Sequence, residues 1–332
     1  MLRPSCWRAL AVTRRTLLSL FVLVGLPAAL WADDAVRAKS EAKTVRLLTV
    51  GNSFSANATH YLSDLAKARG NVLIHQPIVV GGAALELHWG RAERHEKDPQ
   101  DAAGLYGKRS LKQELASEPW DVVTIQQASI KSHDVATYRP FAKQLREYIK
   151  QHAPQAEVLI HQTWAYRCDD PRFSVAKPKL GEPANQAEMY RLLTDAYTTI
   201  AEELELRRIP VGDAFYLADT DPQRGYQPDK SYDFQQKEPT TLPNQTHSLH
   251  VGWRLTKEKD GSQKLTMDGH HANSAGEYLG ACVWYEVLFG DSAVGNEFIP
   301  TGLEKDHARF LQETACKAVI SSRTRQLSEE HK

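Results

Sequence analysis

The sequence predicts an α/β domain with three layers, in which helices cover both faces of a five-stranded parallel sheet. Short apolar runs rich in β-branched residues alternate with longer amphipathic stretches, which is the pattern of repeated strand–helix–strand units. The chain of 332 residues, 42% of them hydrophobic, is also long enough to enclose a large core. We therefore expect one α/β domain rather than a bundle, a sandwich or a disordered chain.

The expected strands are short apolar runs bounded by polar or turn residues. They span residues 44–50, 72–80, 121–126, 157–162 and 208–211. Helices are expected between them where apolar residues recur every three or four positions, at 59–68, 84–95, 138–152 and 186–206. In the third helix, Phe141, Leu145 and Ile149 form one such stripe.

The last helix of the domain has recognisable start and stop signals. Ser274 and Glu277 have the spacing of a capping box, and Gly290 follows the apolar run as a stop. This helix closes a domain expected over residues 44–290, and residues 291–332 are expected to form a C-terminal helical extension.

Two polar stretches, residues 166–185 and 216–267, are longer than ordinary connections and are expected to be insertions at the rim of a site. The second ends with two strand-like runs, 250–257 and 263–267. Asp260 and Gly261 lie between the runs and predict a β-hairpin.

The N-terminus has the composition of an export signal. Residues 1–32 contain four arginines and no acidic residue, and their apolar run is too short for a comfortable membrane span. Arg14 and Arg15 are also typical of a twin-arginine signal, and an uncleaved anchor is the alternative. Removing this segment leaves a flexible stretch, 33–43, and a slightly acidic domain. We expect an exported protein with no nucleic-acid partner and no stable membrane association after cleavage.

Two motifs carry serine chemistry. Ser53 follows the first strand directly, in GNSFS, at the end of the sheet where parallel folds bind ligands. Asp268 and His271 form a DxxH motif before the last helix, so the carboxylate can orient the imidazole that accepts the serine proton. A serine that only caps a helix remains the alternative for GNSFS alone.

The histidines of the second insertion suggest a different chemistry. His247 and His250 form an HxxH pattern with His270 nearby, which is one arrangement of zinc ligands. The loop is long, no carboxylate completes the set, and a serine mechanism requires no metal. We therefore expect neither a metal nor a cofactor.

The ordered motifs resemble the SGNH (GDSL-type) hydrolases, and in particular a poorly characterised subgroup labelled a domain of unknown function. These hydrolases have four conserved sequence blocks. GNSFS resembles the first block, and the glycine pair that ends with Gly82 resembles the second. The segment 120–129 falls at the place of the third block, and the DxxH motif resembles the last. The resemblance spans residues 45–289 and implies the flavodoxin-like SGNH hydrolase fold.

The resemblance also implies a role for each matching residue. Ser53 would be the nucleophile, His271 the general base and acid, and Asp268 its orienting partner. The oxyanion would be bound by the backbone amides of Ser53 and Gly82 and by a side-chain amide. The family supplies that amide from an asparagine that this sequence lacks, so Gln127 is its expected replacement, with Gln126 the second choice.

Five further residues are expected to line the substrate cleft, because they follow the glycine pair or the end of the fourth strand. They are His88, Trp89, His161, Trp164 and Tyr166. For the tryptophans, a place in the core is the alternative.

Together these features predict a secreted serine esterase that removes an acyl group, such as acetyl, from a small-molecule or polysaccharide ester. Two alternatives stay open. A non-catalytic glycan-binding module could be built on the same scaffold, or a sugar hydroxyl could replace water and make the protein an acyltransferase.

Overall fold

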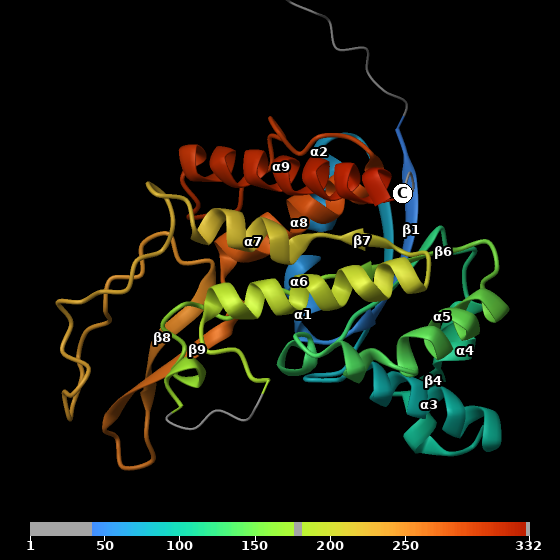
Figure 1. Cartoon of the computed structure of the whole chain (residues 1–332), viewed down its shortest axis with the longest axis horizontal. Helices are drawn as coiled ribbons and strands as arrows, with labels where there is room; N and C mark the ends of the chain where they lie inside the picture. The colour runs from blue at the N-terminus through green and yellow to red at the C-terminus, as the bar shows by residue number, and fades with distance from the viewer. Residues whose placement is uncertain (1–41, 176–180, 330–332) are drawn as a thin grey trace, which may run out of the picture. The chain divides into compact units, whose positions relative to one another are not determined.

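A five-stranded parallel sheet forms the centre of the fold, as Figure 1 shows for a computed structural model that describes residues 42–175 and 181–329. The order across the sheet is β2–β1–β5–β6–β7, which is the flavodoxin-like order and confirms the predicted fold class. The strands are β1 (Thr44–Gly51), β2 (Val72–Val79), β5 (Val122–Ile125), β6 (Glu157–His161) and β7 (Arg207–Ile209). The expected signal peptide, 1–32, and most of the segment 33–43 lie outside the described residues.

Helices cover both faces of this sheet (Figure 1). They are α1 (Ser53–Ala58), α2 (Leu62–Ala68), α3 (Leu85–Lys97), α4 (Leu111–Leu115), α5 (Phe141–His152), α6 (Gln186–Glu203), α7 (Val211–Asp219), α8 (Ser274–Phe289) and α9 (Lys305–Glu329). Two short strands, β3 (Leu105–Tyr106) and β4 (Arg109–Ser110), form a small separate ribbon. Helix α8 packs against α1, α2 and α9, so the C-terminal helix is part of the same compact unit.

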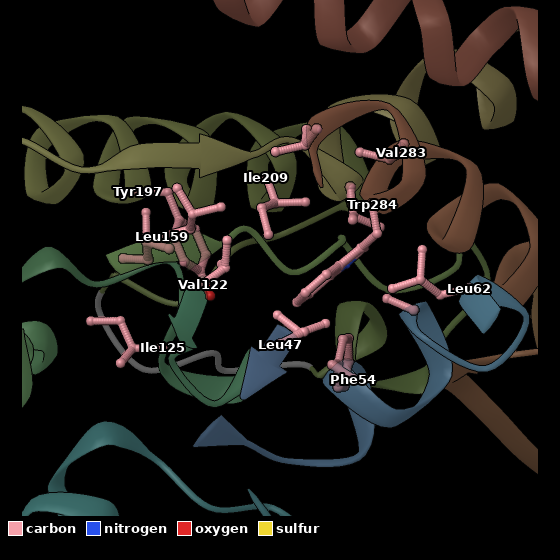
Figure 2. Packing of buried hydrophobic residues seen from close by; sticks show 14 of the residues in the cluster. Leu47, Phe54, Leu62, Val122, Ile125, Leu159, Tyr197, Ile209, Val283 and Trp284 are labelled. Carbon is pink, nitrogen blue, oxygen red and sulfur yellow. The ribbon is translucent and has the colours of Figure 1, made fainter. Parts of the chain in front are cut away.

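The core lies between the sheet and these helices. The interior strand β1 is buried along almost its whole length, as expected for a parallel strand that is covered on both faces. Figure 2 shows Trp284 of α8 above Leu47 of β1, with Phe54 of α1 beside them; all three are buried. The GNSFS motif is therefore attached to a buried strand of the sheet. By contrast, β2 is a half-exposed edge strand, which explains how it tolerates Pro77.

Several element boundaries differ from the sequence prediction. The helix expected at 59–68 begins at Leu62, and a separate short helix that begins at Ser53 itself precedes it. The strand expected at 208–211 ends at Ile209, because Pro210 has no N–H for the ladder and instead precedes α7. The cap of α8 is Asn273 rather than Ser274, since the Asn273 side chain accepts the amides of Ala275 and Gly276. Gly290 does end that helix, in a left-handed conformation.

The second insertion contains the expected hairpin, formed by β8 (His250–Lys257) and β9 (Gln263–Ala272), which projects from the helices in Figure 1. Strand β9 is longer than expected and includes the DxxH motif, which therefore belongs to a strand and not to a loop. Across the described ranges, no helix is both long and apolar enough to cross a lipid bilayer.

Candidate active site

Ser53 is held at the carboxyl end of β1 by the turn that precedes it. Asn52 caps helix α1 by accepting the Phe54 amide at 3.0 Å, and its own amide donates to the carbonyl of Ala83 at 2.8 Å. Gly51 is required here, since a Cβ at this position would lie 2.6 Å from Oε1 of Gln126. Ser53 is the first residue of the helix, so its backbone N–H has no acceptor in a preceding turn.

His271 and Asp268 meet this serine from the hairpin. His271 Nε2 lies 2.9 Å from Ser53 Oγ, and His271 Nδ1 lies 3.0 Å from Asp268 Oδ2. Asp268 also accepts the backbone amide of His271 at 3.1 Å. Residues 218 positions apart thus form a serine–histidine–aspartate relay in the order that the DxxH motif predicted.

An irregularity in β9 explains how the carboxylate reaches two imidazoles. Gly252 pairs with Asp268 and His250 pairs with Ala272, so one intervening residue of β8 faces three of β9. In a regular strand neighbouring side chains point to opposite faces, but the bulge re-aims them. Positions 268 and 270 share a face even in a regular strand, and His270 Nδ1 lies 3.1 Å from Asp268 Oδ1. The bulge is needed to bring His271 to the same carboxylate.

These neighbours set the charge of Asp268. Partial burial alone would raise the pKa of its carboxyl group. The hydrogen bonds from the side chain and backbone of His271, together with the charges of His270 and His271, lower that pKa well below its usual range. Burial lowers the pKa of His270. Asp268 therefore remains a carboxylate through the acidic range, as an orienting partner must.

A cavity of about 220 Å³ opens in front of Ser53. Its lining combines the serine and histidine with both polar and apolar residues. The lining residues are Asn52, Ser53, Phe54, Gly82, Ala128, Ser129, Ile130, Tyr166, Arg172, His270 and His271. Gly82 has φ of 67°, a conformation that glycine adopts easily. Of the five residues expected to line the cleft, Tyr166 does so; its hydroxyl lies 3.1 Å from Ser129 Oγ.

The expected side-chain oxyanion donor, Gln127, does not face the cavity, and that prediction is wrong. Its side-chain nitrogen donates to the Thr137 carbonyl at 2.8 Å, and its oxygen accepts the amides of Leu85 and Ala128. Gln126 is equally engaged, since its nitrogen donates to Asn52 Oδ1 at 2.7 Å and its oxygen accepts from Ser55. Both glutamines are buried and fasten loops together.

His88 and Trp89 belong to the scaffold, so their expected place in the cleft is wrong. His88 is fully buried, with Nε2 3.2 Å from the Gly51 carbonyl and Nδ1 2.9 Å from the Tyr106 hydroxyl. Burial lowers its pKa to about 4, so it is neutral. Trp89 packs edge to face against Tyr148 of α5. The helical period places both residues against neighbouring elements rather than toward Ser53.

His161 and Trp164 are also core residues, contrary to expectation. His161 is fully buried, and its ring packs against Trp284. Trp164 stacks on Phe215 with ring centroids 4.4 Å apart, and its indole N–H donates to the His270 carbonyl at 2.9 Å. Trp164 thus supports the bulge from behind without lining the cavity.

The HxxH pattern does not bring its histidines together. His250 is buried, with Nε2 3.1 Å from the Ala165 carbonyl, while His247 stacks on His307. In the described ranges, the three side chains with metal-ligand spacing are Asp268, His270 and His271, whose ligand atoms lie within 4.8 Å of one another. Asp268 and His271 belong to the serine relay, and their side chains already form hydrogen bonds within it.

Sequence reasoning missed the arginine of this site. Arg172 belongs to a 3-10 turn, Pro171–Ser174, that Asp170 caps. Its Nη2 lies 3.1 Å from His270 Nδ1, and its guanidinium stacks on the Tyr166 ring at 3.6 Å. An aspartate followed by proline does signal such a turn. Nothing in the sequence pattern showed that this turn returns to the DxxH motif.

Comparisons with known proteins agree with this architecture. A family model described as a domain of unknown function, DUF4886, matches residues 46–215. A DUF4886 family protein from Bacteroides uniformis has 25% sequence identity and a TM-score of 0.60, with 83% of this chain and 95% of that chain covered. A candidate SGNH hydrolase from Slackia heliotrinireducens has 22% identity and a TM-score of 0.44, with coverage of 73% and 98%. No curated protein matches. The chain belongs to the DUF4886 family, and it shares its fold with the Bacteroides uniformis member of that family.

Proposed function

We propose that this protein is an exported serine esterase that removes a short acyl group, such as acetyl, from a carbohydrate or other polar alcohol. The observation that carries the proposal is the relay from Ser53 Oγ through His271 to Asp268, with distances of 2.9 Å and 3.0 Å. A serine hydroxyl on a neutral imidazole that a carboxylate orients is the arrangement that activates an oxygen nucleophile.

The reaction follows from these contacts. Ser53 Oγ attacks the ester carbonyl while its proton passes to His271 Nε2, and Asp268 stabilises the imidazolium that forms. The backbone amides of Ser53 and Gly82 are the proposed donors to the oxyanion. His271 then protonates the departing alcohol, and a water molecule activated by the same imidazole hydrolyses the acyl-enzyme.

The size and lining of the cavity support a substrate with a short acyl group and a polar alcohol. Its volume of about 220 Å³ is below the range of about 300–1,000 Å³ that is usual for drug-sized ligands. Ser129, Tyr166 and Arg172 are among its lining residues and offer polar groups for an alcohol. The basic, then apolar, N-terminal segment supports export.

The test uses the mature domain with p-nitrophenyl acetate and acetylated sugars. We expect wild type to hydrolyse both and to be labelled by a fluorophosphonate at Ser53, and Ser53→Ala to lose both properties. Equal background hydrolysis by wild type and Ser53→Ala would refute the esterase. Mass spectrometry of the N-terminus of the secreted protein tests the cleavage of residues 1–32.

The non-catalytic glycan-binding module has one observation in its favour: Gln127 and Gln126 are both engaged, so neither replaces the family's asparagine at the oxyanion. The same experiment decides between the two functions. Binding of a sugar without any turnover that depends on Ser53 would favour the module. Acylated products that form when an acceptor sugar is added would instead indicate acyl transfer.

A further inference from the structure

Two arginines lie near the DxxH motif of the serine relay. Arg172 Nη2 is 3.1 Å from His270 Nδ1, and Arg254 of β8 places its Nη2 3.9 Å from Asp268 Oδ2. Their side chains are 40% and 54% exposed, respectively. Arg172 lines the cavity in front of Ser53, where the proposed reaction releases the alcohol, and Arg254 lies beside the carboxylate of the relay.

The opposite charges lie behind the guanidinium groups. The Asp170 side chain is 3% exposed and that of Asp268 is 13% exposed. A substrate that approaches from solvent therefore meets the cations first, although the net charge of these four residues is close to zero. Buried carboxylates beneath exposed guanidinium groups give a rim that favours an anion.

Arg172 is also preorganised to accept a ligand. Asp170 accepts hydrogen bonds from Arg172 Nε at 2.8 Å and from Nη2 at 2.6 Å, and the guanidinium carbon lies over the Tyr166 ring, 3.6 Å from its centroid. The polar contacts of Arg172 in the described residues use Nε and Nη2, which leaves Nη1 for a ligand in the cavity. Because the side chain is already fixed, binding costs little conformational entropy.

We propose that Arg172, assisted by Arg254, forms an anion subsite for a carboxylate on the alcohol portion of the substrate. The substrate class is then an acylated sugar acid, such as an acetylated uronic acid within an acidic polysaccharide. This inference rests on the proposed esterase function and narrows its substrate.

The experiment compares two substrates that differ only in the charge: an O-acetylated methyl galacturonoside and the matching O-acetylated methyl galactoside. We expect wild type to have the higher kcat/KM for the acid, and the ratio of the two values to fall when 0.5 M NaCl is added. Arg172→Gln should reduce the ratio by about 10-fold or more, because a hydrogen bond to a charged group is lost. Arg254→Gln should reduce it by about 3-fold, as expected for an exposed pair.

The control is Arg191→Gln on α6, another exposed arginine, whose ion pair with Asp195 lies on the helix surface. It should leave both kcat/KM values unchanged. Arg172→Lys keeps the positive charge but loses the planar guanidinium group. Its ratio of kcat/KM for the acid to kcat/KM for the neutral sugar should therefore lie between those of wild type and Arg172→Gln. Circular dichroism checks that each variant is folded, and Arg254→Gln tests the subsite even if Arg172 variants do not fold. A ratio that is equal in wild type and Arg254→Gln, and unaffected by salt, would overturn the proposal.

Calorimetry separates this inference from the esterase itself. Ser53→Ala protein is titrated with methyl galacturonoside and methyl galactoside, neither of which carries an ester. Tighter binding of the acid that Arg172→Gln abolishes supports the subsite even if no ester is turned over. Equal binding of the two sugars counts against the subsite even if the neutral ester is hydrolysed in a Ser53-dependent manner.

Discussion

Gly280 lets helix α8 pack closely against α1, and this contact leads to a quantitative prediction. A Cβ added at Gly280 would lie 2.9 Å from Ala58 Cα and 3.1 Å from Ala58 Cβ. Carbon atoms pack at about 3.5 Å or more, so Gly280→Ala must push the two helices apart by about 0.6 Å. Ala58 is the last residue of α1, and Ser53 is its first, so the displacement acts on the nucleophile.

The magnitude is measured against a matched control, Gly90→Ala. Gly90 lies within α3, where an added Cβ meets no atom within 4 Å. Each substitution gains about 0.5–1 kcal/mol of helix propensity, so the difference between the two isolates the packing cost. For overpacking in a core that cost is about 1–3 kcal/mol. Gly280→Ala should therefore melt at least about 2 °C below Gly90→Ala, given a shift of about 2–4 °C per kcal/mol.

Activity provides the second measurement. A misplacement of about 1 Å costs on the order of 100-fold in rate, so about 0.6 Å should reduce kcat by roughly 10-fold. The assay is acetyl ester hydrolysis, with fluorophosphonate labelling of Ser53 as an independent probe. Gly90→Ala should leave the rate unchanged. Equal melting temperatures and equal rates for the two variants would refute the argument that close packing of α8 positions the serine.

Three other substitutions test separate parts of the structure. Asp268→Asn should keep the fold but reduce kcat by about 10⁴-fold, because the amide cannot hold His271 in the required tautomer; a reduction of less than 10-fold would contradict the relay. Asn52→Asp removes the donor to the buried Ala83 carbonyl and should cost about 1–3 kcal/mol in urea unfolding, whereas unchanged stability would show that the turn does not need this bond. Burial lowers the pKa of His161 from its ordinary value of 6.5 to about 3. Between these two pH values the unfolded chain binds a proton at His161 that the folded chain does not, so the stability of the fold decreases as the pH decreases. His161→Leu should remove about 2 kcal/mol of the stability lost between pH 7 and pH 5; the same pH dependence in wild type and variant would be the contrary result.

The centre of the sheet could be predicted from the sequence because β1, β5 and β6 are mainly apolar runs, and buried parallel strands require such runs. The positions of Ser53 and His271 followed from the motifs that end these elements. The order of the motifs predicted that these two residues lie close together, and Ser53 Oγ is indeed 2.9 Å from His271 Nε2.

The rest of the site depends on contacts that no local pattern encodes. Gln127 has the right chemistry for an oxyanion donor, but the amides of Leu85 and Ala128 and the Thr137 carbonyl engage it. Arg172 comes from an irregular insertion with no periodicity, so its return to the cavity is visible only in three dimensions.

The bulge of β9 has a consequence for how this protein can vary in length. Asp268, His270 and His271 are placed by the number of residues between two paired positions, Gly252–Asp268 and His250–Ala272. Adding or deleting one residue between Asp268 and Ala272 would exchange which imidazole meets the serine. The hairpin tip lies outside this interval, so relatives and engineered variants can lengthen or replace the tip while the catalytic spacing stays fixed.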